Sequence, residues 1–253
     1  MTPGPSGERK NGLHPLLSSR QNAALLEESA SVRNLLGHTV DAIRQMRYIH
    51  LDGDAVFTLG SIGVEKALKV LLGCQVLEHT GSWPSKNTLS NWGHDIEHLS
   101  AQLQGAVEES LDRPSASGYS QNLAEWIQQN STIPLVFATF ARYGKTGRFH
   151  HLDILATDEL GDCEAPLEYW ERVELHVQES VPEFSSLPLH DSAALEEYRR
   201  RLREYIAEQL EAWWFCVHRL GVQGCFGDLG KMIGWEIWAS ERSVPQWLKE
   251  ELR

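Results

Sequence analysis

The densest cluster of residues that could do chemistry lies at residues 141–153 (ARYGKTGRFHHLD). Around two glycines it gathers five candidate binding residues: Arg142, Tyr143, Lys145, Arg148 and His150. Cations bind phosphate, aromatic rings stack on bases, and glycines leave the backbone flexible, so the cluster suits a phosphate group or single-stranded nucleic acid. The alternative is a basic turn in which Tyr143 and Phe149 pack inward and Asp153 pairs with an arginine. The residues alone favour neither interpretation.

Two histidines one helical turn apart, His94 and His98, have a spacing that metal ligands use. The surrounding GHDIEHL approximates the zinc-protease pattern HExxH, with Asp95 in place of the general-base glutamate. The shorter side chain would draw the carboxylate away from a metal-bound water. A simpler interpretation is that Gly93 ends a loop, Asp95 caps a helix and Leu99 enters the core. We therefore predict no metal site and no cofactor.

Apolar periodicity predicts the elements that would position these residues. The predicted helices are 20–50, 55–72, 95–110, 133–143, 192–220 and 244–252, although a strand starting at Val136 and Phe137 is left open within 133–143. A turn is expected at 51–53, where Asp52 or Asp54 could cap the next helix, and a loop at 79–93. Gly60, Gly63 and Ala67 form a stripe of small side chains that would let a neighbouring helix approach closely. Glu65 and Lys69 are expected to form an exposed ion pair worth about a few tenths of a kcal/mol.

The chain is expected to form one helical domain at residues 20–220, preceded by a Pro/Gly/Ser-rich flexible tail at 1–19. Within it, residues 156–191 are acidic and broken by prolines, and predict an irregular insertion in which a short strand is left open. Residues 221–253 form a C-terminal cap. Long helices, short breaks and few convincing strands indicate an all-α bundle.

The densest basic run belongs to the last long predicted helix and comprises Arg199, Arg200, Arg201 and Arg203. Glu196 and Glu197 lie one helical turn before Arg200 and Arg201, a spacing at which opposite charges pair. We interpret this run as a solvated helix face whose charge is mostly matched locally.

Composition narrows the classes of function. A net charge of −12 argues against a general nucleic-acid coat and leaves room for a local cationic site or a basic protein partner. Four cysteines without paired spacing favour a reduced, cytoplasmic setting. No run approaches the roughly 20 apolar residues that a membrane span requires. No apolar segment of a secretory signal follows Arg9 and Lys10.

Three short blocks, taken in order, resemble the HEPN family: GVEKALKVLLG (63–73), GHDIEHL (93–99) and ARYGKTGRF (141–149). The resemblance covers roughly the central half of the chain. It implies a HEPN-like up-and-down helical bundle, here with a C-terminal helical elaboration. It also implies the metal-independent endoribonuclease activity of toxin or defence proteins that act on single-stranded RNA. Because catalytic members commonly pair two subunits, the resemblance implies a homodimer.

Catalytic HEPN proteins carry an arginine, four to six intervening residues and a histidine. Arg33 and His38 match best, because the polar Asn34 follows the arginine. The resemblance then implies that Arg33 holds the scissile phosphate and His38 acts as acid or base. The family places this motif in a late helix, whereas here no arginine stands at the required distance before His218. The alternative is therefore an inactive HEPN-like module that binds RNA or a protein partner within a complex.

Overall fold

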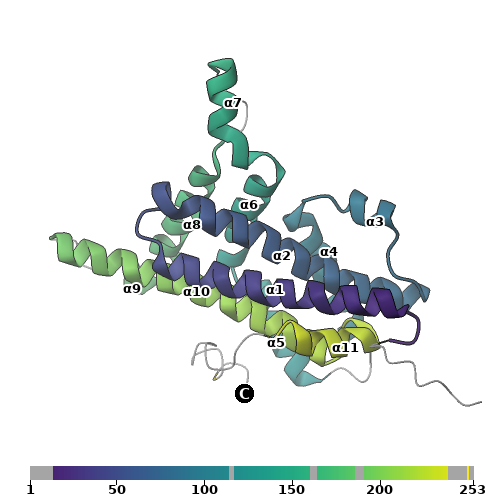
Figure 1. The fold of residues 1–253 in the computed structure, drawn as a ribbon. Helices are drawn as coiled ribbons and strands as arrows, with labels where there is room; N and C mark the ends of the chain where they lie inside the picture. The colour runs from purple at the N-terminus through teal and green to yellow at the C-terminus, as the bar shows by residue number, and fades with distance from the viewer. Residues whose placement is uncertain (1–13, 114–116, 160–163, 186–190, 239–249, 251–253) are drawn as a thin grey trace, which may run out of the picture.

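The computed structural model describes residues 14–113, 117–159, 164–185, 191–238 and 250. Every described element is a helix, which confirms the predicted all-α class (Figure 1). In chain order they are α1 (Ser19–Gln45), α2 (Ile49–Thr80), α3 (Lys86–Asn91), α4 (Ile96–Leu111), α5 (Gly118–Gln129), α6 (Thr132–Lys145), the 3-10 helix η1 (Gly147–Phe149), α7 (His150–Thr157), α8 (Pro166–Ser180), α9 (Pro182–Ser185), α10 (Ser192–Val222) and α11 (Gly227–Glu236).

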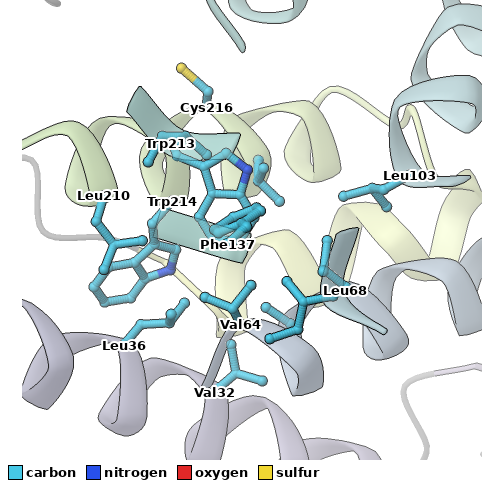
Figure 2. Close-up of a cluster of buried hydrophobic side chains, with 14 of the residues drawn as sticks. Val32, Leu36, Val64, Leu68, Leu103, Phe137, Leu210, Trp213, Trp214 and Cys216 are labelled. Carbon is cyan, nitrogen blue, oxygen red and sulfur yellow. The ribbon is translucent and has the colours of Figure 1, made fainter. Parts of the chain in front are cut away.

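Helix α2 is the centre of the arrangement, since it packs against α1, α4, α6, α8 and α11. Figure 1 shows α1 and α2 side by side, while α10 and α11 lie along the other side of α1. The core between these helices is continuous (Figure 2) and includes Val32, Leu36, Val64, Leu68, Leu103, Phe137, Leu210 and Trp213. Phe137 and Trp213 meet edge to face with ring centroids 4.8 Å apart, an arrangement that adds about 1 kcal/mol to simple burial.

The predicted stripe of small residues brings two helices close to α2. A Cβ atom on Gly60 would lie 2.3 Å from the ring of Phe140 in α6, so only glycine fits there. A Cβ on Gly63 would lie 3.1 Å from Leu35 in α1. The stripe of small residues therefore allows the close approach of neighbouring helices that the sequence predicts.

The corner between α1 and α2 lies earlier in the chain than the sequence predicts. Helix α2 starts at Ile49, so the expected turn at residues 51–53 lies inside it. Asp52 does cap a turn, but it accepts the backbone N–H groups of Arg47 and Tyr48, at 2.8 and 3.2 Å. Because this carboxylate satisfies the amides of the preceding corner, the helix begins before Asp52 instead of after it. The predicted loop at residues 79–93 also differs, since α2 continues to Thr80 and α3 lies within the loop.

The prediction of an irregular insertion at residues 156–191 is wrong for α8, and the short strand left open there is helical. Pro166, expected as a break, is the first residue of α8, a position where its missing N–H would have no partner in any case. Trp170, Val173 and Val177 are fully buried on one face of the helix. Helix α8 packs mainly against α6 and is therefore part of the core.

Helix α11 forms the described part of the expected cap at residues 221–253, of which 239–249 and 251–253 lie outside the described residues. It packs against α10, α2 and α1. The indole N–H of Trp214 on α10 donates to the carbonyl of Ile237 at 2.6 Å, and so fixes the end of α11. Of the expected tail at 1–19, residues 1–13 lie outside the described residues.

His218 makes the stability of the fold depend on pH. Its side chain on α10 is only 3% exposed, and neither ring nitrogen has a hydrogen-bond partner among the described residues. Burial, with a smaller effect of the neighbouring Arg219, lowers its pKa to about 4. The unfolded chain, with a histidine pKa of about 6.5, therefore gains a proton at mild acidity before the folded chain does.

The free energy of unfolding is consequently expected to fall by about 2 kcal/mol between pH 7 and pH 5 because of His218 alone. The loss begins as the pH drops through about 6.5 and levels off below about 4. Urea denaturation at both pH values, in the native protein and in His218→Leu, measures this contribution as the difference between the two pH profiles. Parallel profiles would show that His218 titrates normally in the folded chain.

Candidate functional site

The three blocks that carry the HEPN resemblance meet where α2, α4 and α6 pack together. The Nζ atom of Lys69 on α2 lies 2.7 Å from Oε1 of Glu65 and 2.5 Å from the carbonyl oxygen of Gly93. The other carboxylate oxygen of Glu65 lies 2.9 Å from Nδ1 of His94. The Glu65–Lys69 pair was expected to be exposed, yet the two side chains are only 17% and 21% exposed. They are half-buried because they tie α2 to the chain that leads into α4.

Asp95 connects the second block to the third. As predicted, it caps α4, accepting the backbone N–H of His98 at 3.2 Å. Its other oxygen lies 2.8 Å from Nζ of Lys145, at the end of α6. The hydrogen bond from Lys145, and to a smaller extent the one from His98, lower the pKa of Asp95. Lys145, a predicted RNA-binding residue, is thus already paired with a carboxylate.

Two more of the predicted RNA-binding residues are held in tertiary contacts. Arg142 donates through Nε to the carbonyl oxygen of Glu164 at 2.6 Å, and also to the hydroxyl of Thr146. The hydroxyl of Tyr143 lies 2.8 Å from that of Thr58 on α2. Of the alternative that the sequence left open, Tyr143 does pack against the core, whereas Phe149 is 51% exposed. Arg142 and Lys145 are engaged by other parts of the protein, although Lys145 remains exposed.

The remaining predicted residues, Arg148 and His150, lie on a projection that we call the α7 arm, residues 147–157 (Figure 1). No residue of α7 itself is buried. The guanidinium carbon of Arg148 lies 5.1 Å from the ring centroid of Phe149, which is 51% exposed. The rings of His150 and His151 stack edge to face at 5.3 Å. One arginine and several rings thus gather on the arm in an accessible position.

The base of the arm is narrow. A Cβ atom on Gly147 would lie 2.4 Å from Cγ of Pro166 and 2.9 Å from the carbonyl oxygen of Arg142. Only glycine permits this approach, so the arm leaves the body of the protein against the first turn of α8. Farther along, Leu152 and Leu155 are 60% and 81% exposed.

The predicted catalytic pair occupies α1, away from the arm. Arg33 is half-buried and donates from Nη1 to the carbonyl oxygen of Glu236 at 3.0 Å, so it joins α1 to the end of α11. His38 is exposed. Five helical residues rotate two side chains by about 140° relative to one another, and no contact between Arg33 and His38 is found among the described residues. Within one chain, the structure brings neither residue to the α7 arm.

The two histidines considered as metal ligands have separate partners. His94 contacts Glu65, whereas Nε2 of His98 lies 2.8 Å from the side-chain amide of Gln102. Across the part of the chain that the structure describes, no group of three or more histidine, cysteine or acidic side chains is arranged to hold a metal ion.

A pocket that the sequence did not predict lies beside the α1–α2 corner, facing α8 and α10, with a volume of about 240 Å³. Arg47, Arg199 and Arg203 contribute to its walls. The interpretation of the basic run as a solvated face is wrong for Arg203, which is only 8% exposed. The signal was present in the spacing, because residues four apart lie on one helix face and Arg199 and Arg203 share such a face.

Among its described helices, none combines the length and the apolar character needed to cross a membrane. Comparison of the chain with protein-family models, with curated proteins and with solved structures gave no match. The likeness to the HEPN family therefore rests on the three sequence blocks themselves.

Proposed function

We propose that this chain is a HEPN-like module that binds single-stranded RNA through the α7 arm. The observation that carries the proposal is the exposed pair of Arg148 and Phe149, with the guanidinium group over the ring. Among the described residues, no carboxylate pairs with Arg148. The arm therefore offers a cation and a stacking surface that the fold has not already used.

The chemistry of the arm fits unpaired bases better than a duplex. Each base stacked on an aromatic side chain contributes about 1–3 kcal/mol, whatever its sequence. Phe149, His150 and His151 supply rings, and Arg148 supplies the charge that meets a phosphate. An acidic chain with one exposed arginine beside exposed rings is suited to local contacts with a single strand, since coating a duplex requires a dense cationic surface.

Binding is proposed ahead of cleavage because of the position of Arg33. Its guanidinium group already donates to the carbonyl of Glu236, and His38 lies about 140° away around α1. For the endoribonuclease alternative, Arg33 would have to exchange this partner for the scissile phosphate and a second subunit would have to complete the site. Incubation of single-stranded RNA with the protein in EDTA, compared with Arg33→Ala and His38→Ala, tests that alternative directly.

Arg148→Glu is expected to weaken binding of a short labelled single-stranded RNA by about tenfold, which corresponds to about 1.4 kcal/mol. The reason is that the change removes a phosphate contact and places a negative charge beside the stacking ring. Fluorescence anisotropy at low and moderate salt measures the effect, and the salt dependence should become shallower in the variant.

Arg20→Glu is the matched control, because Arg20 is an exposed arginine at the start of α1 and the change in charge is identical. Its affinity is expected to stay within about twofold of the native protein. Equal losses in the two variants would indicate that only net charge matters. Unchanged affinity in Arg148→Glu would exclude the arm and favour a protein partner instead, for which Leu152 and Leu155 offer apolar contacts.

A further inference from the structure

The pocket beside the α1–α2 corner has the features of a small-molecule site and is separate from the α7 arm. It lies between the corner itself, α8 and α10, and its volume is about 240 Å³. The residues on which the argument depends are Arg47, Tyr48, His50, Glu174, Arg199 and Arg203.

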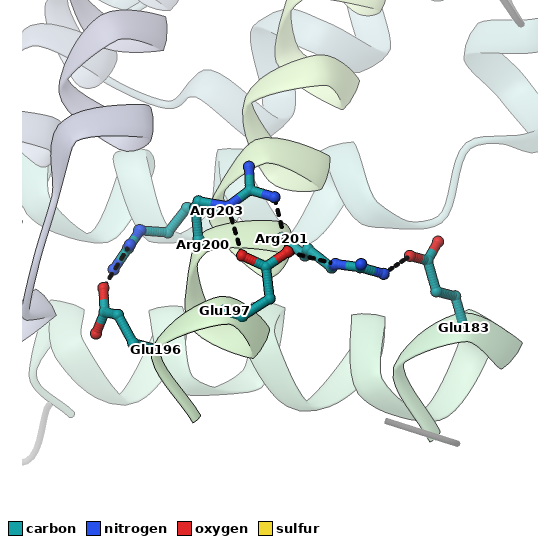
Figure 3. Close-up of polar contacts among 6 residues, drawn as sticks. All are labelled: Glu183, Glu196, Glu197, Arg200, Arg201 and Arg203. Atoms are coloured by element: carbon teal, nitrogen blue, oxygen red, sulfur yellow. Dashed lines mark hydrogen bonds and ion pairs between the residues drawn. The ribbon is translucent and has the colours of Figure 1, made fainter. Parts of the chain in front are cut away.

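The arginines of this pocket differ from most other cations of the chain. On the outer face of α10, Arg200 and Arg201 both pair with Glu197, at 2.8 Å (Figure 3). Arg47 and Arg199, by contrast, have no carboxylate within ion-pair distance among the described residues. Arg199 lies instead over the ring of Tyr48, with its guanidinium carbon 5.7 Å from the ring centroid. Two unmatched positive charges thus converge on one cavity in an acidic protein.

Arg203 adds a third, fixed charge at the inner wall. It is 8% exposed and donates from Nη1 to the carbonyl oxygen of Arg47 at 3.2 Å. Its one described ion pair is with Glu196, also at 3.2 Å, and that carboxylate is 56% exposed (Figure 3). Its Nε atom has no hydrogen-bond partner among the described residues. Burying a guanidinium group with so little compensation costs free energy, which a bound anion would offset.

The N-terminus of α2 also favours a negatively charged ligand in this pocket. Asp52 takes up the backbone N–H groups of Arg47 and Tyr48. The next two amides, those of Ile49 and His50, have no acceptor among the described residues, and both residues line the pocket. Helix α2 has 32 residues, and the N-terminus of a long helix carries a partial positive charge that favours phosphate.

The acidic residues on the opposite wall weaken this field only partly. Glu174 accepts the indole N–H of Trp170 at 2.9 Å, and its burial raises its pKa, which disfavours the charged form. Glu171 lines the pocket and is exposed, so water screens its charge. Three arginines, His50 and a helix N-terminus therefore face one exposed and one disfavoured carboxylate on the opposite wall. Glu196 pairs with Arg203 and Asp52 caps the corner, so Arg47 and Arg199 are the two arginines of the pocket that keep no ion pair among the described residues.

The geometry points to a binding site for a small phosphate monoester whose phosphate is attached to an aromatic ring. The arginines and the first amides of α2 would hold the phosphate oxygens, since one guanidinium group can donate two parallel hydrogen bonds to two oxygens of a phosphate. The ring would stack on Tyr48, which is 50% exposed and already carries the planar group of Arg199.

Phenyl phosphate and inorganic phosphate are suitable probes, with sodium chloride at matched ionic strength as the reference. Both phosphates are expected to raise the melting temperature saturably, and phenyl phosphate is expected to bind at least about fivefold more tightly. No saturable shift at about 10 mM of either compound would overturn the proposal. Equal affinity for the two would overturn the part assigned to the Tyr48 ring.

Arg199→Ala is expected to weaken binding of phenyl phosphate by about tenfold or more. Arg200→Ala is the matched control, because Arg200 is the next residue on α10 and pairs with Glu197 outside the pocket. Its affinity should stay within about twofold of the native value. Equal weakening in the two variants would mean that phosphate responds to general charge, and it would overturn the site. Tyr48→Ala should retain phosphate binding and lose the preference for phenyl phosphate.

One further comparison separates a free small molecule from the end of an RNA strand, which carries the same phosphate chemistry. A short RNA with a 5′-phosphate is tested against the same RNA with a 5′-hydroxyl. Equal binding of the two, unaffected by Arg199→Ala, supports a free ligand. A preference for the 5′-phosphate that Arg199→Ala abolishes would assign the pocket to RNA and overturn a small-molecule ligand. Because Arg148→Glu leaves this pocket intact, failure of the α7 arm proposal is distinguishable from failure here.

Discussion

Replacement of Gly234 by alanine is expected to destabilise the protein by about 3 kcal/mol and to loosen α11 from α10. A Cβ atom at this position would lie 2.5 Å from the backbone nitrogen of Val222, and 2.9 Å from both the carbonyl carbon of Gly221 and the carbonyl oxygen of His218. These are all backbone atoms of α10, so no side chain can rotate to make room. The two helices would have to separate, and the buried contacts of α11 would be lost.

Urea denaturation measures this loss as a change in the free energy of unfolding. Gly105→Ala is the matched control, because Gly105 is exposed within α4 and a Cβ there would meet nothing within 4 Å. This control is expected to stabilise the protein by up to about 1 kcal/mol, since alanine favours the helix more than glycine does. If Gly234→Ala were as well tolerated as the control, the close crossing of α10 and α11 would be wrong.

Arg44→Met is expected to lower the free energy of unfolding by about 3–5 kcal/mol, because it leaves a buried carboxylate without its partner. Arg44 on α1 bridges to two acidic residues of α10: Nη2 lies 2.5 Å from Glu211 and Nε lies 2.9 Å from Glu204. The side chain of Glu211 is only 6% exposed. Chemical denaturation at neutral pH measures the loss directly.

The double variant Arg44→Met/Glu211→Leu is expected to recover most of that stability, since neither unpaired charge then remains buried. Lys66→Met serves as the control: it breaks an ion pair with Glu28 in which the side chains are 34% and 51% exposed. Exposed pairs contribute about 1 kcal/mol at most. A loss in Arg44→Met no larger than in Lys66→Met would show that Glu211 is well hydrated or has other partners.

The long helices could be predicted from the sequence because their apolar positions recur at helical spacing over many turns. The position of the α1–α2 corner could not. It depends on which backbone amides the Asp52 carboxylate reaches, and the residue type permits a cap on either side. Helix α8 was missed for another reason. Trp170, Val173 and Val177 do have helical spacing, but acidic residues and prolines surround them, and Pro166 was interpreted as a break instead of a start.

The residue types of the candidate site could be predicted from the sequence, but the residues that contact them in the folded chain could not. Nothing local to residues 141–149 indicates that Lys145 meets Asp95 or that Arg142 reaches the backbone of Glu164, because those contacts join segments distant in the chain. Arg199 and Arg203 show the reverse case, because they were expected to lie on a solvated, locally paired face and instead line a pocket. Their spacing places them on one helix face, but the nearby glutamates made the whole run resemble a solvated surface.

The contact between Lys145 and Asp95 joins the end of α6 to the N-terminal turn of α4. The same carboxylate that neutralises Lys145 also accepts the first-turn amide of His98. An anion that drew Lys145 away would leave Asp95 free to reorient, and the opening turn of α4 would be the first part of the scaffold to respond. An anion that binds the ammonium group of Lys145 would thus loosen the first turn of α4, while the helices keep their positions relative to one another.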